Sequence, residues 1–268
     1  MVQVLFKLKS LMLGAVISLA ALASAAADDL VSYQAVYEIK LQSASAAADV
    51  KTINGQTHFI LEDVCDGWRS VEDYALSFGF GDDGVSNFIS HYETWEANDA
   101  SAFSFSVLEN SNIEGEQKYD GFANASNGVA ESFHTLDGGV TTELPSSTMF
   151  PTAHMKLLLK KAKEGKRLHQ SHIFLGGDLS SSLYLVNAVL GKERETEELD
   201  VLGAVGMENY WPVTIAYFKP DAVSSEPTYE ISFRIQNNGV IQSYAVDYGD
   251  FVMRADMSAA SKLTPTAC

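Results

Sequence analysis

The feature that most limits the folds open to this chain is a two-residue hydrophobic period that recurs along most of its length. From residue 31 to 41, apolar side chains such as Tyr33, Tyr37 and Ile39 alternate with polar ones, as in a strand that buries one face. Similar short segments follow at 57–61, 68–78, 85–96, 101–108, 116–123, 128–135, 139–144, 170–175, 183–191, 210–218, 228–236 and 240–255. Their spacing of about ten residues favours antiparallel connections. The sequence therefore predicts a mainly β protein of about a dozen strands.

Two asparagine–glycine sequences predict tight turns between strands. Asn54-Gly55 predicts a hairpin whose second strand runs along 57–61, because this pair favours two-residue β-hairpin loops. Asn237-Asn238-Gly239 predicts the turn that joins the strand 228–236 to the strand that begins at Val240.

One segment, at about 152–164, has a helical period instead. Met155, Leu158, Leu159 and Ala162 lie at i, i+3, i+4 and i+7, Thr152 is a candidate N-cap, and Gly165 is a candidate stop. A dozen strands with one amphipathic helix predict a barrel-like or strongly curved sheet, with the helix over an opening or an edge.

The first 27 residues have the composition of a secretory signal peptide. Lys7 and Lys9 precede an apolar stretch from Leu11 to Leu22, and small residues at 23–27 offer a cleavage site. That stretch is too short to span a bilayer comfortably, and no later segment reaches the 18 or more apolar residues of a membrane helix. We therefore expect an exported mature chain, 28–268, that forms a single β-rich domain, because no linker divides it.

The chain contains two cysteines, Cys65 and Cys268. In an oxidising compartment they allow one intramolecular pairing, and two buried free thiols are the alternative. A bridge that closes a loop of about 200 residues could add up to about 5 kcal/mol of stability in the chain-entropy model.

Charge is distributed unevenly along the chain. Residues 1–27 contain two lysines and no acid, so their removal changes the net charge from −17 to −19, and nucleic acid is an unfavourable partner. Six basic residues nevertheless cluster on and just after the predicted helix: Lys156, Lys160, Lys161, Lys163, Lys166 and Arg167. They form either a solvated helix face, where cations near a helix C-terminus are favoured, or a docking surface for anionic lipid or an acidic partner.

Catalytic signatures are absent from the sequence. It has no Gly-x-Ser-x-Gly elbow and no glycine-rich phosphate loop. His169 and His172, three apart in a strand-like stretch, point to opposite faces and are poor joint metal ligands. We therefore expect no catalytic residues, no metal site, no cofactor and no enzymatic activity.

Aromatic side chains gather on one side of the predicted strands. They are Tyr33, Tyr37, Phe103, Phe105, Tyr229 and Phe233. These rings either fill the core or line a cavity for an apolar ligand, since a barrel of many strands can enclose more volume than its side chains fill.

Several short strings together resemble the EipB family of periplasmic proteins of alphaproteobacteria. They are Cys65-Asp66-Gly67-Trp68, Thr94-Trp95-Glu96, Leu144-Pro145, Phe150-Pro151-Thr152-Ala153-His154, Asp247-Tyr248-Gly249-Asp250-Phe251 and the terminal Cys268. The resemblance covers essentially the whole mature chain. It implies a spiral-like, barrel-forming antiparallel β structure, a disulfide between Cys65 and Cys268, a periplasmic location, and a role in cell-envelope integrity without catalysis.

Three classes of function follow from these observations. The first is a non-enzymatic envelope protein that supports integrity or resistance to envelope stress by binding partners. The second is a periplasmic carrier of a lipid or lipoprotein acyl chain, because the family's barrel is similar to such carriers. The third is an envelope hydrolase. A continuous apolar cavity would favour the carrier, a filled barrel with an exposed patch the partner-binding protein, and convergent carboxylates or histidines in a cleft the enzyme.

Overall fold

The computed structural model describes residues 30–264, apart from 82–83, 114, 127, 136–138, 178–181, 198–199 and 222. The predicted signal peptide and Cys268 lie outside the described residues. No helix in the described part of the chain is long and apolar enough to cross a membrane.

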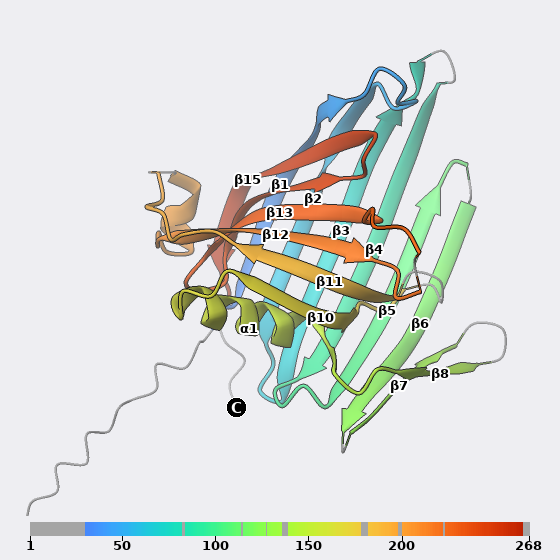
Figure 1. Cartoon of the computed structure of the whole chain (residues 1–268). Helices are drawn as coiled ribbons and strands as arrows, with labels where there is room; N and C mark the ends of the chain where they lie inside the picture. Colours follow the sequence, from blue (N-terminus) through green and yellow to red (C-terminus); the bar gives the residue numbers. More distant parts are fainter. Residues whose placement is uncertain are drawn as a thin grey trace, which may run out of the picture.

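The described residues form fifteen strands, one α-helix and a short 3₁₀ helix, η3 (Asp200–Ala204) (Figure 1). The first eight strands are β1 (Tyr33–Ala44), β2 (Thr52–Asp63), β3 (Gly67–Gly79), β4 (Val85–Ala97), β5 (Ala102–Ser111), β6 (Gly115–Ser126), β7 (Val129–His134) and β8 (Val140–Leu144). The remaining elements are β9 (Thr148–Met149), α1 (Pro151–Lys163), β10 (Leu168–Phe174), β11 (Leu183–Leu190), β12 (Tyr210–Phe218), β13 (Tyr229–Gln236), β14 (Ile241–Asp247) and β15 (Phe251–Lys262).

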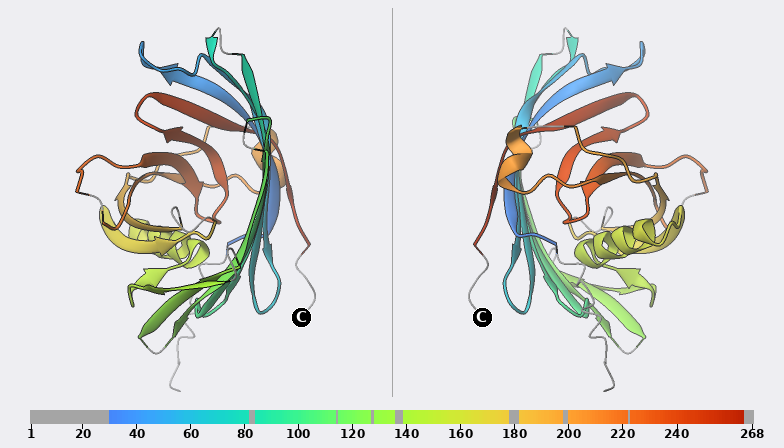
Figure 2. Two further views of the ribbon diagram at one scale, coloured as in Figure 1. Left: turned by 90° about the vertical axis from the view of Figure 1, so that its right-hand side faces the viewer. Right: turned by 90° about the vertical axis from the view of Figure 1, so that its left-hand side faces the viewer.

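All fifteen strands belong to one sheet, in the order β8-β7-β6-β5-β4-β3-β2-β1-β15-β14-β13-β12-β11-β10-β9. Every described pair is antiparallel except β9–β10. On one side of β1 the sheet continues through β2 to β8. On its other side the sheet begins with β15, which pairs directly with β1. The strands β10–β15 curl back over the inner face of the long strands, and α1 lies on the inner side of this curl (Figure 2). The result is a nearly closed barrel, which confirms the mainly β, barrel-forming fold with one helix.

The Asn54-Gly55 hairpin prediction is wrong. Both residues lie inside β2, where Gly55 is opposite Ile39 and Leu76, and the chain reverses earlier, within 45–51. A side chain at Gly55 would place its Cβ 2.2 Å from the carbonyl oxygen of Ala75. This glycine is therefore required by a close backbone approach, as glycines within strands often are. The predicted turn at 237–239 is confirmed, because Gly239 has φ +84° and connects β13 to β14.

The helix α1 occupies the predicted position, but its N-terminus is capped differently. Phe150 is the N-cap residue and makes no side-chain cap bond, so the assignment of Thr152 as N-cap is wrong. Instead, Glu96 of β4 accepts hydrogen bonds from the backbone N–H groups of Thr152 and Ala153 at 2.7 and 2.8 Å. A carboxylate there also opposes the positive end of the helix dipole. Gly165 ends the helix as predicted, in the left-handed region at φ +74°.

Two hydrophobic clusters fill the space inside the sheet. The larger one joins β1–β3, α1 and β10–β15. The smaller one lies beneath β5–β7, where Phe103, Phe105, Phe150 and Phe174 pack ring against ring.

Candidate functional site

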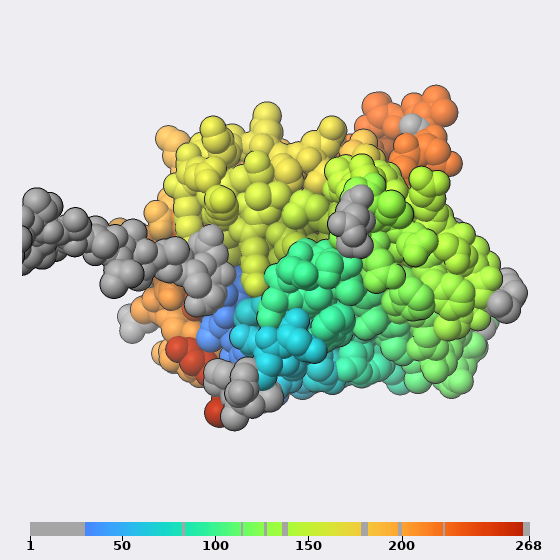
Figure 3. Space-filling view, turned by 90° about the horizontal axis from the view of Figure 1, so that it is seen from below, coloured from blue at the N-terminus to red at the C-terminus, as the bar shows by residue number. Residues whose placement is uncertain are grey.

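The larger cluster surrounds a cavity of about 260 Å³. Side chains of β1–β3 line one wall, those of β12–β14 line the other, and α1 and β10 contribute from one end. Seen from below, the yellow-green segment that contains α1 packs against strands of the blue-to-green half of the sheet and covers this end of the barrel (Figure 3). The volume is close to the lower end of the about 300–1,000 Å³ range of ligand pockets.

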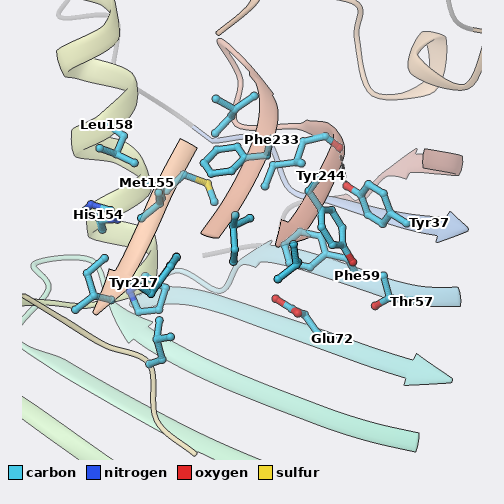
Figure 4. A pocket seen from close by; sticks show the side chains of 18 of the residues that line it. Tyr37, Thr57, Phe59, Glu72, His154, Met155, Leu158, Tyr217, Phe233 and Tyr244 are labelled. Atoms are coloured by element: carbon cyan, nitrogen blue, oxygen red, sulfur yellow. Dashed lines mark hydrogen bonds between the residues drawn. The ribbon is translucent and has the colours of Figure 1, made fainter. Parts of the chain in front are cut away.

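The wall opposite β1–β3 is apolar because the period-two pattern of β13 holds its alternate residues inward. Ile231, Phe233 and Ile235 face the cavity, and each lies opposite an apolar residue of β12 or β14. On the α1 side, Met155 and Leu158 extend this apolar surface (Figure 4). This half of the cavity therefore suits a hydrocarbon chain.

The other end of the cavity contains a carboxylate. Glu72 of β3 lies there with Thr57, Tyr37 and Tyr244, across the cavity from the side chains of α1 (Figure 4). Its one hydrogen bond among the described residues comes from the Tyr74 hydroxyl, at 2.7 Å. Burial raises the pKa of Glu72 above its ordinary value, and the Tyr74 hydrogen bond opposes that rise.

Some hydroxyl groups around Glu72 have hydrogen-bond partners and others do not. The Tyr37 hydroxyl donates to the carbonyl of Ile241 at 2.7 Å. By contrast, Thr57 Oγ1 and the Tyr244 hydroxyl are buried and make no hydrogen bond of normal geometry to described residues. Burial raises the pKa of Tyr33 to about 12 and that of Tyr244 further, so these phenols stay neutral. Buried polar atoms without partners are uncommon, and here two of them belong to residues that line the cavity.

His154 is the buried polar residue on the helix side. It is 4% exposed, and its Nε2 has no described hydrogen-bond partner. Burial, with a smaller contribution from neighbouring His169, lowers the pKa of His154 to about 3, so the imidazole is neutral at physiological pH. Within the described residues, no group of three or more His, Cys, Asp or Glu side chains is arranged to hold a metal ion.

The structure brings together only some of the aromatic residues predicted to line a ligand site. Tyr33, Tyr37 and Phe233 border the cavity. Phe103 and Phe105 lie outside it, because β5 is four strands away from β1 and packs into the smaller cluster. Tyr229 also lies outside the lining and stacks on Tyr217 with ring centroids 4.5 Å apart.

The cavity contains four functional candidates that the sequence reasoning missed: Thr57, Glu72, Tyr74 and Tyr244. A signal for Glu72 was present, since even-numbered residues of β3 such as Trp68 and Leu76 form its apolar side. An acid on the apolar side of an amphipathic strand is a candidate for function, because burying a lone carboxylate is costly.

The six basic residues of the α1 region have unequal roles. Lys156 places its ammonium 4.8 Å from the centre of the Trp68 ring, and Arg167 donates to the carbonyl groups of Leu190 and Gly191. Lys161 is half-buried. Lys160 and Lys163 are exposed at the C-terminal end of the helix, and Lys166 is exposed in the turn after it.

Cys65, the first cysteine of the predicted disulfide, lies in the same region as the end of β15. Cys65 lies in the turn between β2 and β3 at φ 73°. The end of β15 reaches the same region, because Ser32 accepts a backbone hydrogen bond from Leu263 and its hydroxyl accepts one from Asp63. Cys268 itself lies outside the described residues, so the pairing stays a prediction.

Three of the strings that carried the family resemblance, 65–68, 94–96 and 150–154, meet at one corner of the barrel. Trp95 donates to Asp66 at 3.3 Å, and a Cβ on Gly67 would lie 2.3 Å from the carbonyl oxygen of Glu96. Glu96 in turn caps α1. These residues therefore fix the helix over the cavity.

Comparisons with known proteins agree with this architecture. A family model described as EipB-like matches residues 24–264. The cell envelope integrity protein EipB of Brucella abortus (strain 2308) is 26% identical over 243 residues, which cover 88% of this chain and 86% of that protein. A crystal structure of a β-barrel-like protein of a domain of unknown function from Brucella abortus has a TM-score of 0.80 at 24% identity, covering 88% of this chain and 99% of that one. At that identity the structural match shows the fold, whereas the family model spans most of the sequence: this chain belongs to the EipB-like family, which is associated with cell-envelope integrity and not named for a catalytic activity.

Proposed function

We propose that this protein acts in the periplasm, after removal of residues 1–27, as a single-domain binding protein that supports envelope integrity by holding an apolar chain inside its barrel. The ligand class is the acyl chain of a lipid or lipoprotein. The observation that carries the proposal is the cavity, whose apolar half is formed by Met155, Leu158 and the inward residues of β13.

The size of the cavity sets the length of chain that fits. At about 30 Å³ per water-sized group, it accepts about nine non-hydrogen atoms. Burying eight methylene groups gives roughly 6 kcal/mol before the cost of association. The cavity therefore suits a short chain or one segment of a longer one.

The arrangement supports binding rather than hydrolysis. Glu72 and His154, the acid and the imidazole of the cavity, lie on opposite sides of it (Figure 4). Nucleophilic catalysis requires a nucleophile and a base within hydrogen-bond reach of each other, and the described lining contains no such pair.

A blocking variant tests the proposal. Ile231→Trp adds bulk to the cavity wall, whereas Ser232→Trp adds the same ring to the exposed side of β13. Mass spectrometry of protein purified natively from the periplasm should find an acyl-bearing molecule on the parent and on the Ser232 variant, and less than a tenth as much on the Ile231 variant. Circular dichroism must show that both variants are folded. Equal loading of all three proteins, or no ligand on the parent, would contradict the proposal.

A second candidate function rests on the outer face of α1. Lys160 and Lys163 are exposed there, and Lys166 is exposed just beyond the helix, on a chain of strongly negative net charge. They form a basic face at one end of the barrel that suits an anionic lipid surface or an acidic envelope protein.

A further inference from the structure

The end of the cavity opposite α1 presents hydrogen-bond acceptors and contains no cation of its own. The Glu72 carboxyl has one neutral donor, the Tyr74 hydroxyl. No lysine or arginine is among the described residues that line the cavity. Carboxylates buried in proteins are normally ion-paired or coordinated to a metal, so Glu72 lacks the partner that such a group requires.

Two further oxygen atoms at this end have unused bonding capacity. Thr57, 2% exposed, has an Oγ1 without a described hydrogen-bond partner. The Tyr244 hydroxyl is likewise buried; it lies next to the Tyr74 hydroxyl but makes no hydrogen bond of normal geometry. Thr57 and Tyr244 lie on the same side of the cavity as Glu72 (Figure 4), and a primary ammonium, with three donors and no acceptor, matches a carboxylate flanked by hydroxyl oxygen atoms.

Aromatic rings surround the same end of the cavity. Tyr33 packs against Phe59 with ring centroids 5.5 Å apart, and Tyr37 packs edge-on against Tyr244 at 5.5 Å. All four residues line the cavity. Aromatic faces attract ammonium ions, most strongly where both are removed from water.

We infer that the cavity recognises a ligand with a primary ammonium group at the end of a short apolar chain, in which the ammonium pairs with the Glu72 carboxylate and the chain extends toward Met155 and Leu158. This inference rests on the proposed function, because it requires an apolar chain in the barrel. It adds the chemistry of the headgroup.

The same geometry disfavours anionic headgroups. A carboxylate or phosphate beside Glu72 would bring two like charges together without a protein cation between them, which costs several kcal/mol in binding specificity. An alcohol avoids this repulsion but supplies only one donor. The expected order of affinity for chains of equal length is therefore amine, then alcohol, then carboxylate.

Recognition of an ammonium group depends on the ionisation of Glu72. Below the folded-state pKa of Glu72 the carboxyl is neutral and the ion pair is lost. The other titratable groups that face it stay uncharged between pH 5 and pH 8, because burial raises the pKa of each phenol and lowers that of the imidazole: Tyr33, Tyr37, Tyr74, Tyr92, Tyr217, Tyr244 and His154. An alkylammonium resembles a lysine side chain, with a pKa of about 10.4, and remains charged throughout.

Calorimetric titration of the mature protein with octylamine, 1-octanol and octanoate at pH 8 provides the first test. Octylamine should bind at least tenfold more tightly than 1-octanol. Octanoate should bind at least tenfold more weakly than 1-octanol. As the pH is lowered through the folded-state pKa of Glu72, the octylamine affinity should fall while that of 1-octanol stays the same. Octanoate binding as tightly as octylamine would overturn the inference. Failure of all three probes to bind would overturn the apolar-chain function itself, and the headgroup inference with it.

Variants identify the responsible carboxylate. In Glu72→Gln, the preference for octylamine over 1-octanol should drop below threefold while 1-octanol binding is retained, which also reports a folded cavity. Glu38→Gln makes the same change of charge on the exposed side of β1, two strands from β3, and should leave the preference intact. A Glu72 variant that keeps a tenfold preference, or a Glu38 variant that loses it, would overturn the assignment.

Discussion

Two inward-facing acids show how one residue type can serve opposite purposes in this barrel. Burial raises the pKa of both Glu72 and Glu96. Glu96, 3% exposed, is compensated by two backbone N–H groups of α1. Glu72 has the Tyr74 hydroxyl and open cavity beside it. The first acid therefore supports the fold, whereas the second remains available to a ligand.

This difference predicts that Glu72→Gln stabilises the ligand-free protein at high pH. An acid whose folded-state pKa is raised binds more protons when folded, so the free energy of unfolding falls as pH rises above the ordinary value of 4.5. The amide does not ionise, and its oxygen still accepts the Tyr74 hydroxyl. The melting temperature should rise by about 2–4 °C at pH 8, the shift for about 1 kcal/mol in a chain of this size.

At pH 4.5 the Glu72 carboxyl is mostly neutral when folded and half ionised when unfolded, so most of the effect is lost and the same substitution should raise the melting temperature by about 1 °C or less. Thermal unfolding followed by circular dichroism at both pH values makes the comparison, with Glu38→Gln as the exposed control. A gain at pH 4.5 equal to that at pH 8 would show that the effect does not come from ionisation.

At the residue scale, the sequence predicted which side chains point inward better than it predicted their functional roles. The alternation around Tyr33 and Tyr37 correctly placed both rings inside, because the period of a strand assigns faces directly. The same rule places Glu72 inside the barrel. Its role as a candidate binding residue, however, depends on Thr57 and Tyr244, whose strands are not brought together by any local sequence pattern.

At the scale of elements, α1 combines two surfaces. Its inner side includes Leu158 and Leu159, both buried, while Lys160 and Lys163 are exposed near its C-terminal end and Lys166 is exposed in the turn that follows. An apolar inner face next to a basic outer face is suited to a helix that covers a cavity and contacts an anionic surface.

Replacing these three lysines with glutamine tests the outer face. Glutamine has nearly the helix propensity of lysine, so the melting temperature should change by less than about 2 °C. Binding to vesicles that contain phosphatidylglycerol at low salt should fall at least tenfold, because each basic residue near an anionic surface contributes about 1 kcal/mol. Cosedimentation measures the bound fraction.

The matched control is Lys40→Gln, Lys51→Gln and Lys118→Gln, which removes three exposed charges on β1, the β1–β2 connection and β6. It should bind vesicles as the parent does. Equal loss in both triple variants would mean that net charge, and not the α1 face, governs binding. Lys156 is left unchanged because it packs over Trp68.

The errors at the element scale have specific physical causes. The predicted strand 240–255 is two strands, β14 and β15, since Gly249 at φ +87° allows a turn between two apolar runs. The two-residue β9 is too short to show a period. Asn54-Gly55 looked like a turn because the composition that favours tight turns also fits a strand position without room for a side chain.

At the scale of the whole molecule, the cavity exists because the sheet closes on itself. β1 lies between β2, its neighbour in sequence, and β15, which is more than 200 residues away. This pairing turns the inner face of β1–β3 toward β12–β14. Local periodicity predicted a barrel, but it could not specify the β1–β15 pairing, because register across so long a separation is set by packing of the complete sheet.

The predicted Cys65–Cys268 bridge would add a covalent bond near the long-range seam, the junction where β15 pairs with β1. The turn that carries Cys65 and the end of β15 are already joined through Ser32, by hydrogen bonds to Asp63 and Leu263. A covalent bond there would close nearly the whole mature chain into one loop and restrict its unfolded state. We therefore expect Cys268→Ser to lower the free energy of unfolding by about 2–5 kcal/mol.

Urea unfolding of the oxidised parent, Cys268→Ser, Cys65→Ser and the double variant measures this effect. The double variant should be no less stable than either single variant, because all three lack the same bond, and added reductant should lower the stability of the parent alone. Peptide mapping without reduction should recover Cys65 and Cys268 in one linked fragment. If both thiols can be alkylated in unfolded, unreduced protein, the seam is held by β1–β15 pairing without a covalent bond, and the barrel then depends on the packing around its cavity to stay closed.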